Sequence, residues 1–62
     1  MVIQKKLIPY MQGEKLLNAQ GYMAEATIGE GLLRYRAQEF DFTLEGVIKK
    51  IFKHYETHRK EN

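Results

Sequence analysis

The chain contains no cysteine and no serine, and its single proline is Pro9. Without cysteine it can form no disulfide, zinc finger or thiol nucleophile, and without serine it has no serine nucleophile. No run of about 18 apolar residues occurs, and Lys5 and Lys6 interrupt the stretch where a signal peptide would need an unbroken apolar core. We therefore expect a cytoplasmic protein with no membrane segment.

Sixty-two residues suffice for one domain with a thin core, because a chain of this length buries only about 60% of the surface that its unfolded form exposes. The apolar fraction of 44% and the charged fraction of 29% are ordinary for a folded domain. We expect residues 1–62 to form a single, complete domain. Because so small a core is marginally stable, we also expect a homodimer, joined by a sheet edge or by a helix.

Residues 43–59 carry the clearest pattern, the apolar stripe of an amphipathic helix. Thr43 is the expected N-cap, with Asp41 as the other candidate, and Glu45 stands four residues before Lys49, a favourable spacing for an ion pair. Gly46 is a poor helix former and indicates that another backbone segment approaches closely. The stripe consists of Leu44, Val47, Ile48, Ile51, Phe52 and Tyr55.

Residues 22–39 fit two patterns, since Leu33, Ala37 and Phe40 have helical spacing while residues 33–38 alternate apolar and polar. Pairing the strands 22–28 and 31–39 across a two-residue turn at Gly29-Glu30 favours a hairpin, because small residues then face large ones and Glu25 faces Arg34. A helix would instead have glycine twice in its first turn.

The predicted fold is therefore α+β, a small antiparallel sheet of two or three strands packed under one C-terminal helix at 43–59. The helix is expected to cover the sheet face that carries Tyr22, Ala24, Ala26, Leu33, Tyr35 and Ala37. The uncovered face would carry Met23, Glu25, Thr27, Leu32, Arg34, Arg36 and Gln38.

Residues 1–21 are less decisive. Val2 to Ile8 has the composition of a strand, which Pro9 ends or restricts to a sheet edge. Residues 13–20 fit either a short helix or the second arm of a hairpin that turns at Gln12-Gly13. Asn18 would lie on the buried side of that arm, which counts against the hairpin.

Catalytic patterns are weak. His54 and His58 lie on one helix face with the spacing of two metal ligands, but no third ligand accompanies them, so we interpret both as solvated side chains. Gly29-Glu30-Gly31 lacks the lysine and the following helix of a phosphate loop and is interpreted as a turn. We expect no enzyme activity, no cofactor and no metal.

The candidate binding residues are Arg34, Arg36 and Gln38, because arginine and glutamine are side chains that read base edges and all three project from the uncovered face. Lys49, Lys50 and Lys53 would add phosphate contacts, in the segment 43–62 that carries the whole net charge of +2. Glu25, Glu39 and Asp41 nearby would oppose a phosphate. The sequence thus favours a regulatory protein that binds DNA or RNA through a basic sheet face.

The order of a hairpin followed by a helix resembles the three-stranded arm-binding domains of phage-type integrases. The resemblance covers residues 22–59, is one of topology and includes no diagnostic motif, so it identifies no family. A ribbon-helix-helix repressor ranks below it, since its groove-facing strand residues would be Met23, Glu25 and Thr27.

The alternative function is that of a protein-interaction module, such as an inhibitor or adaptor. Its partner would bind an apolar patch of Met23, Leu32 and Phe42, extended by the loop of Tyr10 and Met11.

Overall fold

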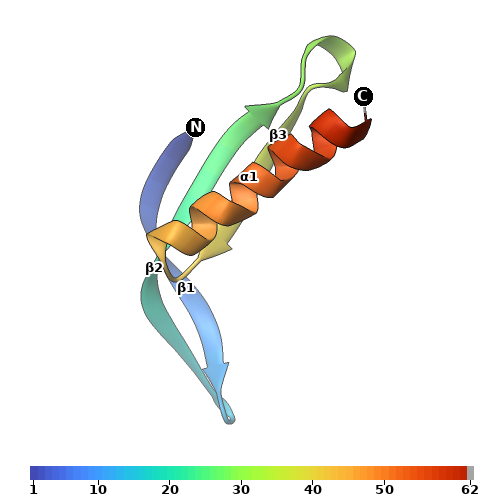
Figure 1. Cartoon of the computed structure of the whole chain (residues 1–62). Coiled ribbons are helices and arrows are strands. Elements are labelled where there is room, and N and C mark those ends of the chain that lie inside the picture. Colours follow the sequence, from blue (N-terminus) through green and yellow to red (C-terminus); the bar gives the residue numbers. More distant parts are fainter. Residues whose placement is uncertain (62) are drawn as a thin grey trace.

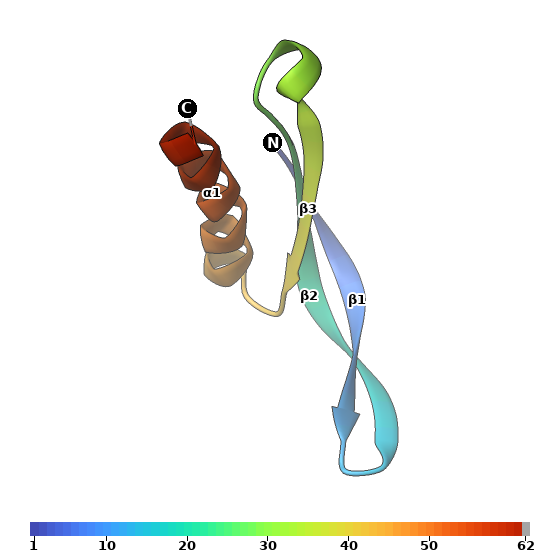
Figure 2. The ribbon, with the colours of Figure 1, turned by 90° about the vertical axis from the view of Figure 1, so that its right-hand side faces the viewer.

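The computed structural model describes residues 1–61, with side chains as far as Arg59, as three strands and a C-terminal helix (Figure 1). The strands β1 (Val2–Gln12), β2 (Lys15–Ile28) and β3 (Tyr35–Asp41) form an antiparallel sheet in the order β1-β2-β3. The helix α1 (Leu44–Glu61) follows β3 and lies across one face of the sheet (Figure 2). The predicted α+β fold is therefore confirmed.

The strands β1 and β2 form a long hairpin, so the alternative of a short helix at residues 13–20 is wrong. Its turn is Gly13-Glu14, and Gly13 has a φ of 63°, which glycine adopts without strain. Pro9 is tolerated because β1 is an edge strand. The far half of this hairpin, residues 7–20, extends beyond α1 and is called the arm (Figures 1 and 2). Asn18 is exposed because α1 does not reach the arm.

The hairpin of β2 and β3 is present, but its predicted register is wrong. Ala26 lies opposite Ala37 and not opposite Leu33, a shift of four residues along the second strand. The connection is longer than the predicted turn, since it contains a short 3₁₀ helix (Gly31–Leu33) in which the Leu33 N–H donates to the Glu30 carbonyl at 3.2 Å. Because the shift is an even number of residues, the side chains of both strands keep their predicted faces.

The core lies between α1 and the face of the sheet that carries alternate residues of β2 and β3, here called the covered face. Alanines on the sheet allow the helix to approach closely, and Val47 and Ile51 of α1 are fully buried. Leu33, predicted on this face, is 70% exposed because it lies in the connection. The core consists of Ala24, Ala26, Ile28, Ala37, Val47 and Ile51, flanked by Tyr22, Ile48 and Tyr55.

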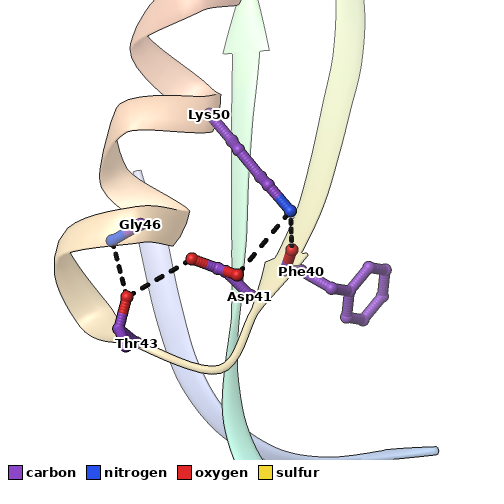
Figure 3. A network of polar contacts seen from close by, with 5 residues as sticks. All are labelled: Phe40, Asp41, Thr43, Gly46 and Lys50. Carbon is purple, nitrogen blue, oxygen red and sulfur yellow. Dashed lines mark hydrogen bonds and ion pairs between the residues drawn. The ribbon is translucent and has the colours of Figure 1, made fainter. Parts of the chain in front are cut away.

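The start of α1 confirms the predicted N-cap (Figure 3). The Gly46 N–H donates to the Thr43 hydroxyl oxygen at 3.0 Å, and the Thr43 hydroxyl donates to the Asp41 carboxylate at 3.3 Å. A Cβ on Gly46 would overlap that carboxylate, so a side chain, and not the predicted backbone segment, is the close neighbour. The predicted pair of Glu45 and Lys49 is present at 3.2 Å. No helix in the described part of the chain combines the length and apolar character needed to cross a membrane.

Candidate functional site

The face of the sheet opposite α1 carries the side chains that the core does not use. It consists of the even-numbered residues of β1 and β3 and the odd-numbered residues of β2, with Phe42 just after β3, and is called the open face. Within the described residues, no other element lies over it (Figure 2). Its composition therefore decides what this side of the molecule can bind.

Three aromatic rings gather on the open face. Tyr10, Phe40 and Phe42 are 37%, 39% and 45% exposed. The Tyr10 and Phe42 rings meet edge to face with centroids 5.9 Å apart, and the Lys6 ammonium lies 5.8 Å from the centroid of the Phe40 ring. Figure 3 shows Phe40 pointing away from α1. A cation thus lies over one of three partly exposed rings, which come from β1 and from the end of β3.

Met23 on the central strand forms the floor of this face. It lies between Gln4 on β1 and Phe40 on β3 and is only 5% exposed. The Gln38 amide nitrogen approaches its sulfur at 3.8 Å. The prediction of an exposed Met23 is wrong, because a third strand places neighbours on both sides of it.

The open face carries more positive than negative charge. Its basic strand residues are Lys6, Lys15 and Arg36, and its acidic strand residue is Glu25. Glu25 and Arg36 form an ion pair at 3.1 Å. The predicted pairing of Glu25 with Arg34 is wrong, because the register brings Arg36 beside Glu25 instead.

The acidic residues of β3 point to the other side of the sheet. Glu39 lies 2.7 Å from His54 Nε2, whose Nδ1 is 3.1 Å from the Tyr35 hydroxyl. A histidine protonated on Nε2 donates to Glu39 and accepts from Tyr35 at Nδ1, so one tautomer satisfies both contacts. Lys50 donates to the Phe40 carbonyl at 2.7 Å and lies 3.8 Å from the Asp41 carboxylate (Figure 3). Glu39 and Asp41 therefore do not oppose an anion on the open face.

Contrary to the prediction, the two histidines are not solvated side chains. His54 is half-buried between Tyr35 and Glu39, and His58 is half-buried where a Cβ on Gly29 would come within 2.9 Å of its ring. In the part of the chain that the structure describes, no group of three or more histidine, aspartate or glutamate side chains is arranged to hold a metal ion.

The six predicted nucleic-acid contacts fall on two sides of the molecule. Arg34 lies in the connection and not on a strand, but with Arg36 it lines one depression at the end of the open face, and Gln38 follows on β3. Lys49, Lys50 and Lys53 lie on α1, across the sheet from Arg36. Because the helix packs on the face opposite the arginines, the three lysines and the three residues Arg34, Arg36 and Gln38 lie on different sides of the sheet.

Lys6 and Phe40 are site residues that the sequence pattern did not indicate. Tyr10 and Phe42 were predicted only as part of the alternative apolar patch. Phe40 and Phe42 continue the alternation of Arg36 and Gln38, so extending the predicted strand by a few residues would have revealed them. Lys6 and Tyr10 reach the site only through the pairing of β1 with β2, which the sequence left open.

The alternative apolar patch is not assembled. Met23 is buried, while Leu32 and Phe42 lie beyond opposite ends of β3. The seven residues of that strand separate them by about 20 Å. These three residues therefore form no continuous surface to which a partner protein could bind.

Comparisons of the chain with family models, with curated proteins and with solved structures find no match. The chemistry of the open face is therefore the basis for inferring a function. Exposed rings offer stacking surfaces, Lys6 and Arg36 offer contacts for phosphate, and the amides of Gln4 and Gln38 offer donors and acceptors for base edges.

Proposed function

We propose that this protein binds single-stranded nucleic acid on the open face of its sheet. It acts as a small cytoplasmic regulatory protein and catalyses no reaction. The observation that carries the proposal is the exposed aromatic side chains of Tyr10, Phe40 and Phe42 together with the Lys6 ammonium over the Phe40 ring.

The combination of rings and cations favours a single strand over a duplex. Bases in a duplex are already stacked on one another, whereas the bases of a single strand can stack on aromatic side chains. Phe40 on β3 and Phe42 just after its end are two residues apart in the chain, so they offer stacking surfaces for neighbouring bases. Lys6, Arg36 and Arg34 lie where they can contact the backbone of such a strand.

The direct test is fluorescence anisotropy with labelled single-stranded oligo(dT) and oligo(U) and with a duplex of the same length at low salt. We expect both single strands to bind more tightly than the duplex. Phe40→Ala with Phe42→Ala should weaken single-strand binding by about 1–3 kcal/mol per lost stacking contact, roughly 5- to 150-fold. Absence of any complex at low salt, or tighter binding of the duplex, would exclude the proposal.

A pair of lysines provides the matched control. Lys6→Ala should weaken binding and lower the slope of log K against log salt by about 0.7, the contribution of one phosphate contact on a single strand. Lys53→Ala removes the same charge from α1, on the other side of the sheet, and should leave affinity and slope unchanged. Equal effects of the two substitutions would show that net charge, and not the open face, determines binding.

A further inference from the structure

The chain exposes more surface than a compact protein of its mass. Its accessible surface is 5104 Å², whereas a folded monomer of 7.3 kDa is expected to expose about 4200 Å². Its radius of gyration is 14.0 Å, against about 10.6 Å for a compact chain of this length. The difference in area, about 900 Å², is close to the roughly 800 Å² that each partner buries in a stable protein interface.

Part of the exposed apolar surface lies on one face of the arm, here called its underside, which carries the strand positions that continue the covered face beyond α1. The hairpin twists between the two regions, so the underside is turned relative to the sheet beneath α1 (Figure 2). Leu7, Met11 and Leu16 share this underside, and they are 65%, 62% and 68% exposed. Met11 and Leu16 are directly opposite each other across the hairpin. The sheet face on which α1 packs thus extends into an apolar strip that no helix of the same chain covers.

A second apolar strip lies on the flank of α1. Leu44 and Phe52 are 46% and 50% exposed. Phe52 follows Lys50 by two residues, about 200° around the helix, and Lys50 contacts β3. Phe52 therefore projects from the opposite flank, on the side of β1, which lies outside the main contacts of α1 with β2 and β3.

The sheet edges do not offer an equivalent route to association. β1 carries Lys5, Lys6 and Pro9, which discourage the pairing of another strand at an edge. On β3, the Phe40 carbonyl already accepts a hydrogen bond from Lys50. Association through the two apolar strips, face against face, uses neither edge.

We propose that a second copy of this chain occupies this surface, with the α1 flank of each copy packed on the arm underside of the other around a two-fold axis. Each copy then contributes one strip of each kind, so the interface is self-complementary. A helix packed on the arm repeats the packing that α1 already makes on the covered face. The open face lies on the other side of the sheet and stays accessible, so this proposal does not depend on the proposed function.

Sedimentation equilibrium with charged substitutions tests the proposal. We expect the native chain to sediment as a dimer, at twice its mass of 7.3 kDa. Leu16→Glu and Phe52→Glu should each raise the dimer Kd at least about tenfold. Leu32→Glu, at an exposed position in the connection far from both strips, is the matched control and should leave the Kd unchanged. Circular dichroism should show folded protein for all three, because the substituted side chains are largely exposed within one chain.

A native chain that stays monomeric would overturn the proposal, as would a dimer that Leu32→Glu dissociates while Leu16→Glu does not. Because the chain has no cysteine, cross-linking can also test the arrangement. Chains carrying Leu16→Cys mixed with chains carrying Phe52→Cys should give a mixed dimer with a short bis-maleimide. Cross-linking of the Leu16→Cys chains only to one another would place arm against arm and contradict the proposed packing.

Discussion

Gly21 is the residue on which the close approach of the strands depends most directly. It is buried on the central strand, where a Cβ would lie 2.8 Å from the Asp41 carbonyl oxygen and would overlap the Ile8 side chain. Only glycine fits at this position, because the Ile8 side chain and the Asp41 carbonyl oxygen occupy the space that a Cβ would need. Gly21 therefore lies where the arm, the central strand and the end of β3 that leads into α1 come together.

Gly21→Ala is expected to lower the free energy of unfolding by about 1–3 kcal/mol, the usual cost of forcing an extra carbon into a packed site. Urea denaturation measures the change. In an Ile8→Val background the cost should fall in part, because one of the two obstructing groups becomes smaller, while the Asp41 carbonyl remains. A neutral or stabilising Gly21→Ala would contradict the described packing.

At the scale of elements, α1 is held at its start by polar contacts and along its length by the apolar stripe. Thr43 caps the first turn, Asp41 accepts from Thr43, and Lys50 connects the second turn to the end of β3 (Figure 3). These contacts fix the direction in which the helix leaves the sheet. With the helix in this direction, both the open face and the arm stay uncovered, and these are the surfaces on which the proposed nucleic-acid binding and dimerisation depend.

Thr43→Ala is expected to lower the free energy of unfolding by about 1 kcal/mol, because the Gly46 N–H loses its acceptor. Thr57→Ala makes the same change at an exposed position within α1 and should alter stability by less than about 0.5 kcal/mol. Thermal or urea unfolding of the two variants side by side makes the comparison. Equal losses would mean that the hydroxyl of Thr43 does not cap the helix.

Across the molecule as a whole, the sheet places its acidic side chains on two different faces. Glu39 and Asp41 are engaged by His54 and Lys50 on the side of the helix. Glu25 is the acidic strand residue of the open face and is paired with Arg36. An anionic ligand on the open face would meet one carboxylate and compete with it for Arg36.

Glu25→Gln is therefore expected to strengthen the binding of a single-stranded oligonucleotide by about 0.2–1 kcal/mol, up to roughly fivefold, because it releases an exposed ion pair. Anisotropy titrations at a fixed salt concentration measure the change. Glu45→Gln breaks an equivalent exposed pair, with Lys49 on α1, and should leave affinity unaltered. Weaker binding by the Glu25→Gln variant would indicate that the carboxylate itself contacts the ligand.

The fold class follows from the sequence, because the patterns that indicate it are local. The apolar spacing of residues 44–55 is that of a helix, Thr43 is a good cap, and the alternation around Ala24, Ala26 and Ala37 assigns side chains to the faces of a sheet. For the residues that lie in the strands, these assignments survived a wrong register, since a shift by an even number of residues leaves their side chains on the same face.

The register, the arm and the composition of the open face depend on contacts between distant parts of the chain, which are seen only in the folded structure. The register depends on the length of the connection after Ile28, and the 3₁₀ turn that begins at Gly31 leaves no apolar pattern to reveal that length. Lys6 and Tyr10 meet Phe40 and Phe42 only because β1 pairs with β2, a contact between residues far apart in the chain. Which residues share a face is a local property, but which strands lie side by side is not.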